Sequence, residues 1–440
     1  MHLWVVKTLE PLPSPEGTVR LARAGLVARM AAARGWRVTW WNSRHDRITG
    51  MPRRPEEIAA TRALGIEPEL LDGPAYRRAI SVRRFLHDFA TAGDFARRVR
   101  GRAPPDVIYC CMPPIELTAV VVHWARRHGV PVAVDVRDIW PDLWTELAPP
   151  GLRAAARLLA VPYRRLLSGA LARADALFAC GTRALDWALA LAGRGIRPAD
   201  GVFPHAVPMD PLPAAVLREA ESFWEERGLS RRRGCGERLR IVFAGSLTER
   251  AGCLAFLREF LALPTRIREG VRVIVAGRGE QAAAVTELAA REPAITWVDW
   301  LDRARLRVLY ERCDIGVAPY LRTSEMGWIL VNKFGEYLAH GLPVLTTLTG
   351  EVEAFVREHA CGLVWSPGRR EELADRIETL CRPARLTALK EAARRVGPRF
   401  AADRVYAGLL DRLSELAGDG QKDEGPDARG PCGGFVPSSA

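Results

Sequence analysis

The sequence has very little lysine. Only four of its 64 basic residues are lysines (Lys7, Lys333, Lys390 and Lys422), and the others are arginines. The 440 residues also carry 52 acidic side chains, so the net charge is +12. Because the guanidinium group binds phosphates and anionic surfaces well, this composition favours anionic partners. A GC-rich genome would produce the same bias towards arginine.

Paired cysteines are also missing. Of the nine cysteines, Cys110 and Cys111 are adjacent and the other seven are scattered without a Cys-x-x-Cys pair, and several, such as Cys180, lie within apolar runs. Isolated thiols of this kind are typical of a reducing compartment and supply no zinc ligand set. The chain has no Asp-x-Asp pair and no His/Cys cluster, so we expect neither a metal nor a bound cofactor.

No apolar run reaches the roughly 18 residues that a membrane-spanning helix needs, and Glu10, Pro11 and Pro13 interrupt any signal-peptide pattern. These absences predict a cytoplasmic protein. Residues 151–173 contain five arginines, no acid and many apolar side chains. This stretch leaves two alternatives open: an ordinary helix covering a sheet, or peripheral binding to an anionic membrane at the inner face of the plasma membrane.

What the sequence does have is a repeated alternation of short apolar runs and helical patterns. The chain is 48% hydrophobic and long enough for two cores. Continuous apolar strands separated by helices are typical of a parallel sheet covered on both faces. The alternation stops near Pro208 and restarts at Ile241, so we predict an α/β fold with two tandem doubly wound, Rossmann-like domains.

The same pattern predicts the domain boundaries. Residues 1–207 form the first domain, 208–237 the link, and 238–400 the second domain. Residues 401–417 form a helix for which a return to the first domain stays open, and 418–440 are expected to be disordered. Because such sheets bind ligands at the carboxyl ends of their strands, we expect a ligand cleft between the domains.

The loop from Gly245 to Gly252 follows a predicted strand and opens a helix. Glycines and a helix N-terminus suit a phosphate, although a plain strand–helix turn has the same appearance. The loop is neither a Walker loop nor Gly-x-Gly-x-x-Gly, which disfavours P-loop NTPases and ordinary dehydrogenases.

The segment from Asn332 to Leu345 is more specific, because it combines Lys333, Glu336 and Gly341 ahead of a Pro-led apolar strand. It resembles the nucleotide-sugar signature of family 4 glycosyltransferases of the GT-B fold. With Glu10–Pro13 and Asp135–Asp142, the resemblance extends to the WbuB-like subgroup, which assembles surface polysaccharides. It covers about residues 1–415.

On the donor side, the resemblance implies that Glu336 accepts hydrogen bonds from the ribose hydroxyls. Asn332 and Lys333 would meet the pyrophosphate, and the turn 298–300 would hold the base. The phosphate-facing loop would contribute Gly245, Ser246 and Arg250. The family often has Arg and Lys at the positions of Ser246 and Ala251.

On the catalytic side, the resemblance points to Arg137 and Asp138, after a first-domain strand. Glu325 is the nearest match to the family's sugar-contacting glutamate, because Trp328 stands eight residues before Glu336. Gly17, in the first strand–helix loop, would approach the donor or acceptor.

The resemblance implies a hexosyl- or N-acetylhexosaminyl-transferase. Its donor would be a nucleotide sugar, most often UDP-linked, and its acceptor a lipid-linked or polysaccharide glycan, with retention of anomeric configuration. Two other functions stay open: a nucleotide-sugar epimerase and a catalytically silent subunit of a polysaccharide-assembly complex. Nucleic acid is not an expected partner, because the basic residues are not interleaved with an aromatic platform.

Overall fold

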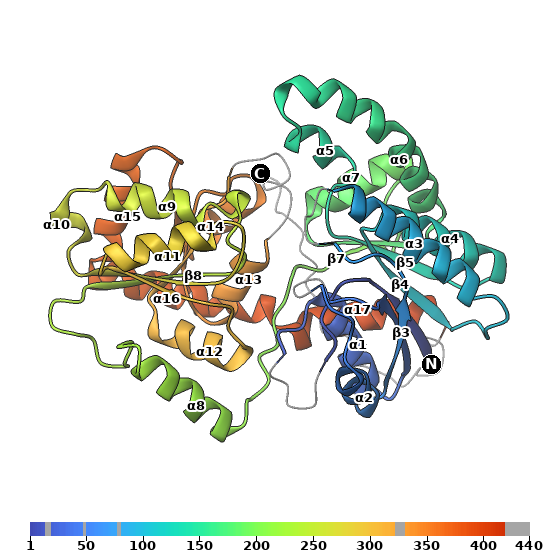
Figure 1. The fold of residues 1–440 in the computed structure, drawn as a ribbon, viewed down its shortest axis with the longest axis horizontal. Coiled ribbons are helices and arrows are strands. Elements are labelled where there is room, and N and C mark those ends of the chain that lie inside the picture. Colours follow the sequence, from blue (N-terminus) through green and yellow to red (C-terminus); the bar gives the residue numbers. More distant parts are fainter. Residues whose placement is uncertain (14–18, 47–49, 77–80, 322–330, 419–440) are drawn as a thin grey trace. The chain divides into compact units, whose positions relative to one another are not determined.

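The computed structural model describes residues 1–13, 19–46, 50–76, 81–321 and 331–418 (Figure 1). The chain divides into two compact units. Unit 1 comprises Met1–Pro11, Val27–Phe203 and the chain from Tyr406 on, and unit 2 comprises Leu12–Leu26 and Pro204–Val405. A short segment from the beginning of the sequence therefore belongs to the unit that is built mainly from the second half.

Unit 1 is built on a seven-stranded parallel sheet with the strand order β3-β2-β1-β4-β5-β6-β7. The order reverses between β1 and β4, as in other doubly wound sheets. The strands are β1 (His2–Val6), β2 (Arg37–Ser43), β3 (Ile66–Leu71), β4 (Val107–Met112), β5 (Val132–Val136), β6 (Ala176–Ala179) and β7 (Gly201–Val202).

Helices cover this sheet because its strands are apolar on both faces. Trp4 of β1 packs between two other rings, with ring centroids 5.3 Å from Trp41 and 5.0 Å from Trp124. The helices are α1 (Arg23–Ala33), α2 (Pro55–Ala63), α3 (Val82–Arg98), α4 (Ile115–His128), α5 (Asp142–Leu147), η1 (Pro150–Leu152), α6 (Arg153–Arg173), α7 (Thr182–Ala192) and α17 (Ala402–Leu416).

Unit 2 has a six-stranded parallel sheet with the order β10-β9-β8-β11-β12-β13, which reverses between β8 and β11. Its strands are β8 (Leu239–Ala244), β9 (Val271–Ala276), β10 (Ile295–Val298), β11 (Ile315–Ala318), β12 (Val344–Thr346) and β13 (Gly362–Val364). Its helices are α8 (Ala214–Glu225), η2 (Glu249–Ala251), α9 (Cys253–Leu261), α10 (Thr265–Arg268), α11 (Ala282–Arg291), α12 (Arg303–Arg312), α13 (Asn332–Ala339), α14 (Glu351–His359), α15 (Arg370–Leu380), α16 (Pro383–Val396) and η4 (Gly397–Phe400).

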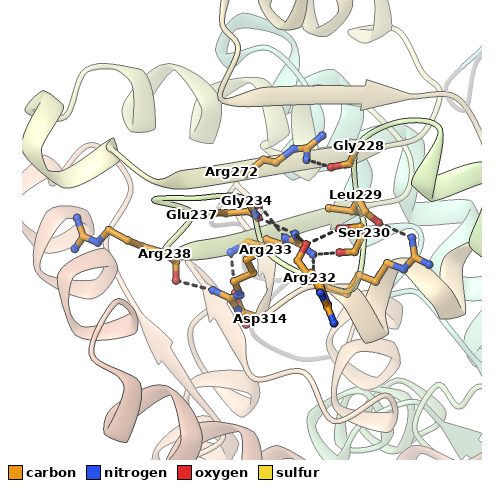
Figure 2. A network of polar contacts seen from close by, with 12 residues as sticks. Gly228, Leu229, Ser230, Arg232, Arg233, Gly234, Glu237, Arg238, Arg272 and Asp314 are labelled. Carbon is orange, nitrogen blue, oxygen red and sulfur yellow. Dashed lines mark hydrogen bonds and ion pairs between the residues drawn. The ribbon is translucent and has the colours of Figure 1, made fainter.

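Residues 208–237 belong to unit 2 and are held against the rest of it at two places. The buried Trp224 of α8 donates from Nε1 to the Arg305 carbonyl of α12 at 2.8 Å. Further on, the Asp314 carboxylate pairs with Arg233 (Figure 2). The same carboxylate pairs with Lys390 at 2.6 Å. It also accepts the Arg240 amide at 2.8 Å, so these contacts hold the segment to the amino-terminal ends of β8 and β11.

The two-sheet α/β fold predicted from the sequence is confirmed by the two parallel sheets. The predicted helix from Gly151 is a short 3₁₀ turn followed by α6. The strand β3 escaped prediction because Glu67, Pro68 and Glu69 interrupt its apolar pattern; it lies at a sheet edge, where proline is tolerated. Within the described residues, no helix is both long and apolar enough to cross a membrane.

Candidate functional site

The carboxyl end of the unit 2 sheet brings together residues from three elements. The strand order reverses between β8 and β11, and doubly wound sheets bind ligands at such a switch point. Gly245 follows β8, Tyr320 follows β11, and α13 begins at Asn332. Most of the predicted donor residues therefore lie at the carboxyl end of the unit 2 sheet.

Lys333 of α13 lies directly over Gly245. Its side chain is 6% exposed, and its Nζ lies 3.2 Å from the Tyr320 hydroxyl and 4.6 Å from the centroid of the Phe243 ring. Gly245 has φ 143°, and a Cβ atom there would lie 2.6 Å from Lys333 Cε, so only glycine fits. No carboxylate within the described residues pairs with Lys333, so its cation lies at the switch point without an ion-pair partner there.

Tyr337 fixes α13 against the sheet. Its buried hydroxyl accepts the Ala244 amide at 3.0 Å, at the end of β8, and contacts the Val317 carbonyl of β11 at 3.4 Å. A Cβ atom at Gly316 would lie 2.2 Å from the Tyr337 ring, so β11 and α13 are in close contact. Because residues three apart share one face of a helix, Lys333 and Glu336 are presented together.

Glu336 is not a solvated helix charge. It is 6% exposed, and its carboxylate accepts a hydrogen bond from the guanidinium of Arg20, in the Leu12–Leu26 segment of unit 2. Burial lowers the pKa of Arg20, but the Glu336 carboxylate and the Tyr310 and Tyr337 phenols together raise it, so the net shift is upward. Burial also raises the pKa of the Tyr310 phenol well above its usual range, and Glu336 adds to that shift.

Arg20 was not predicted as a site residue. It is separated from Glu336 by 316 positions, and no local pattern connects the two. Its guanidinium also lies 5.4 Å from the ring centroid of Trp300, in the turn that was expected to hold the base. In that turn Asp299 pairs with Arg278 at 2.7 Å, and the hydrogen bond from Arg278 lowers the pKa of Asp299.

The other predicted donor residues surround the loop after β8. Ser246 and Asn332 are exposed, whereas Arg250 is partly buried and its carbonyl accepts the Leu321 amide at 3.0 Å. A Cβ atom at Gly252 would lie 1.7 Å from the Pro319 carbonyl oxygen, so the loop packs tightly against the end of β11. The loop is therefore held in place, with Ser246 open to solvent.

Unit 1 has a different polar cluster at its own switch point. Lys7, after β1, donates from Nζ to the Pro113 carbonyl after β4 at 2.5 Å. Arg137, after β5, pairs with the buried Glu10. Burial lowers the pKa of Lys7, and Arg137 lowers it further. Burial also lowers the pKa of Arg137, but Glu10 together with Cys111, Asp135 and Cys180 raises it, so that the pKa lies well above its usual range.

Asp138 lies beside this cluster and is partly buried. Within the described residues it forms no ion pair, and its charge favours the protonated form of Lys7. Two more acids lie close by: burial raises the pKa of Asp88 to about 6 and that of Glu116 to about 7. The sequence analysis missed Lys7, Asp88 and Glu116. Only Lys7 carried a usable signal, as a charged residue directly after a buried strand.

The remaining predicted residues, Gly17 and Glu325, lie outside the described residues, and so does Trp328. The structure therefore groups Glu336, Lys333 and Gly245 in unit 2 and, separately, Arg137 and Asp138 in unit 1.

Comparison with known proteins adds two findings. Residues 238–382 match the family model of group 1 glycosyl transferases, whereas comparison with curated protein sequences gives no match.

Among solved structures, HepE of Anabaena in complex with UDP is similar with a TM-score of 0.63 and 14% identity, over 94% of this chain and 99% of HepE. Sucrose-phosphate synthase of Thermosynechococcus elongatus has a TM-score of 0.68 and 14% identity, over 95% and 99% of the two chains. WaaG, a glycosyltransferase involved in lipopolysaccharide biosynthesis, has a TM-score of 0.64 and 14% identity, over 94% and 100%. The chain therefore has the GT-B fold, with two Rossmann-like units.

Proposed function

We propose that this chain is a glycosyltransferase of family 4. It takes a sugar from a nucleotide-sugar donor, UDP-linked, and transfers it to a lipid-linked or polysaccharide acceptor with retention of configuration. The observation that carries the proposal is the position of Lys333 and Glu336 on one face of α13, with Lys333 over Gly245. The match to group 1 glycosyl transferases covers these residues, and HepE was solved with UDP.

The donor would bind at the switch point of unit 2. The first amides of α13 and the Lys333 cation suit the pyrophosphate, because a helix N-terminus and an ammonium group both attract anions. During transfer the pyrophosphate leaves with negative charge, which the buried Lys333 cation would stabilise. Glu336 would accept hydrogen bonds from the ribose hydroxyls, and such charge-assisted bonds are strong.

The acceptor side of the reaction is assigned to unit 1. Asp138, which forms no ion pair within the described residues, would face the acceptor, and Arg137 would hold the polar cluster around it. We expect transfer to need no divalent metal and to continue in excess EDTA. Loss of activity on chelation, with recovery on adding magnesium or manganese, would contradict that expectation. With a lipid-linked acceptor, the enzyme would act at the inner face of the plasma membrane.

Calorimetric titration of UDP and uridine tests the donor site. Glu336→Gln keeps the shape but removes the charge, so it should weaken both ligands by about 1–3 kcal/mol, roughly ten- to a hundredfold. Lys333→Met should weaken UDP by a similar factor and leave uridine unchanged, because uridine has no phosphates. Glu287→Gln, on the exposed face of α11, is the matched control. Unchanged UDP affinity in Glu336→Gln would reject the ribose assignment.

Product analysis separates the proposed activity from the alternatives. The chain should consume UDP-sugar and form a glycosylated product only when an acceptor is present. Conversion of the donor sugar without acceptor would identify an epimerase instead, and UDP-sugar binding without any turnover would identify a silent subunit.

A further inference from the structure

The amino-terminal end of the unit 2 sheet carries a cavity of about 270 Å³. It lies at the opposite end of β8 and β11 from Gly245 and Tyr320, so it is separate from the candidate donor site. Its lining consists of five cations, two carboxylates and one thiol: Arg231, Arg233, Arg240, Arg312, Lys390, Glu311, Asp314 and Cys313. Drug-sized ligands occupy about 300–1,000 Å³, so a cavity of this volume suits a smaller molecule.

The two lining carboxylates do not balance the five cations. Arg233 and Lys390 both bond to the same oxygen, Oδ1, of Asp314, whose side chain is 1% exposed. One buried negative charge therefore lies between two positive charges. Glu311 is 46% exposed and pairs at 3.0 Å with Arg307, which lies outside the lining. The wall of the cavity thus carries more positive than negative charge.

Arg312, at the end of α12, is a buried cation with an unused donor. Its side chain is 2% exposed, and one terminal nitrogen donates to the Leu229 carbonyl. The other lies 3.3 Å from Glu225, which is 60% exposed. Within the part of the chain that the structure describes, Arg312 Nε has no hydrogen-bond partner. Burial lowers the pKa of Arg312 by more than Glu225 and Glu221 raise it, so its charge is incompletely compensated.

The loop before β8 holds this wall in place. The guanidinium of Arg240 bonds to Glu237 at 2.7 and 2.9 Å and to the Ser230 carbonyl at 2.7 Å. Arg233 donates to the Arg238 carbonyl at 2.7 Å. Figure 2 shows Ser230, Arg233 and Glu237 within this network of polar contacts. Several of the cations are therefore fixed before a ligand binds, which lowers the entropy that binding costs.

Two of the lining cations are more accessible. The side chains of Arg231 and Lys390 are 72% and 23% exposed. Arg231 pairs at 2.6 Å with Glu221, and exposed pairs of this kind contribute about 1 kcal/mol or less. Arg231 can therefore turn towards a bound anion at little cost in free energy.

This arrangement favours a phosphate anion. Guanidinium groups present paired N–H donors that match phosphate oxygens, and an ammonium group adds a point charge. A carboxylate has fewer oxygens and less charge, so it would satisfy fewer of these donors. Nucleic acid would need aromatic stacking platforms, and none of the eight lining residues is aromatic. The lining also offers little apolar surface, so it does not favour an organic group attached to the phosphate.

We propose that the cavity at the amino-terminal end of the unit 2 sheet binds a free inorganic phosphate or diphosphate. Arg312 and Lys390 bind its oxygens from the wall, and Arg231 contacts it from the more exposed side. Because this cavity and the residues around Lys333 lie at opposite ends of the strands, the inference does not depend on the proposed function.

Calorimetric titration of inorganic pyrophosphate into the full chain tests the proposal. Because Lys333 also attracts anions, the host chain carries Lys333→Met. It should bind one pyrophosphate, and sodium chloride at the same ionic strength should not replace that ligand. Arg231→Gln with Lys390→Gln should weaken binding about tenfold or more, because two charged donors are lost. Lys390→Arg keeps the cation and should stay within about threefold of the host.

Hydrogen exchange locates the bound anion. Pyrophosphate should slow exchange in peptides that cover residues 229–240 and 311–314 of the host and leave residues 245–252 unchanged. In the double variant Asp314 keeps its bond to Arg233, so the melting temperature should match that of the host. Arg291→Gln, in an exposed ion pair on α11, is the matched control and should bind pyrophosphate like the host.

Three results would overturn the proposal. A network that only stabilises the fold would bind no pyrophosphate. Unchanged affinity in the double variant would place the anion elsewhere on the chain. Tighter binding of glycerol 3-phosphate than of inorganic phosphate would reject a free inorganic ligand.

Discussion

The two sheets reverse their strand order in the same way, but a different element supplies the lysine at each point of reversal. In unit 1 the residue that follows the central strand β1 is Lys7, whose side chain occupies the position and bonds to the Pro113 carbonyl. In unit 2 the residue that follows β8 is Gly245, and the lysine at that position comes from α13. Two of the four lysines in the chain therefore lie at the two switch points. One is supplied by a strand end and the other by a helix.

This difference affects which of the two switch points can bind an anion. Around Lys7, the Arg137–Glu10 pair and Asp138 already form a cluster of both signs, so much of its charge is compensated. Around Lys333 the described neighbours are aromatic rings and glycine, and no carboxylate pairs with it there. A buried cation without such a partner attracts a negatively charged ligand. The switch point of unit 2 therefore suits an anionic ligand better than the switch point of unit 1 does.

The largest expected effect comes from breaking the ion pair in unit 1. Arg137→Met leaves the Glu10 carboxylate, whose side chain is 7% exposed, without its guanidinium partner. Removing one partner of a buried pair costs about 3–5 kcal/mol in the free energy of unfolding. Hydrogen exchange of peptides from unit 1 measures this loss. The UDP affinity of unit 2 should not change.

A double variant shows whether the pair itself matters. Glu10→Gln with Arg137→Met removes both charges, so it should recover much of the stability that the single variant loses. If Arg137→Met alone were as stable as the native chain, the contrast between the charge-compensated cluster around Lys7 and the environment of Lys333 would fail.

The comparison also shows how far a sequence predicts a site. Lys333 and Glu336 could be predicted as donor-site residues because they lie within one short segment, next to a Gly-Leu-Pro-Val strand. The sheets were predicted because buried parallel strands are continuously apolar. Arg20 and Lys7 were missed, because their partners Glu336 and Pro113 are 316 and 106 positions away, and only the folded chain brings them together.

A second, smaller effect should appear as a pH dependence of the stability of unit 1. Burial raises the pKa of Glu116 from its ordinary 4.5 to about 7. Between these values the folded chain holds a proton that the unfolded chain releases, so stability falls as the pH rises, by up to about 3 kcal/mol. The free energy of unfolding of Glu116→Gln should depend less on pH over this range. At about pH 8 this variant should be more stable than the native chain.

Urea unfolding at constant ionic strength, followed by hydrogen exchange in α4, measures the Glu116 effect. Glu67→Gln replaces an acid that is roughly half exposed, in an ion pair with Arg62, and should keep the native pH dependence. Parallel curves for Glu116→Gln and the native chain would show that Glu116 titrates at its ordinary pKa.

The smallest expected effect concerns Arg20, which forms an ion pair with Glu336 in unit 2. The Arg20 side chain is 26% exposed, and its guanidinium bonds the carboxylate that ribose hydroxyls would use. A hydroxyl is a weaker partner than a cation, so nucleoside must compete with Arg20 for Glu336. Partly exposed ion pairs contribute about 1 kcal/mol or less.

Arg20→Gln should therefore strengthen uridine binding by up to about fivefold, which corresponds to about 1 kcal/mol. Calorimetric titration measures the change, and Arg266→Gln, in an exposed ion pair with Glu378, serves as the matched control. In a chain that already carries Glu336→Gln, the Arg20 substitution should have no further effect, because the two side chains act through one contact. Weaker uridine binding in Arg20→Gln would reverse the interpretation: Arg20 would then hold Glu336 in its binding orientation, and the ion pair would be part of the nucleotide site.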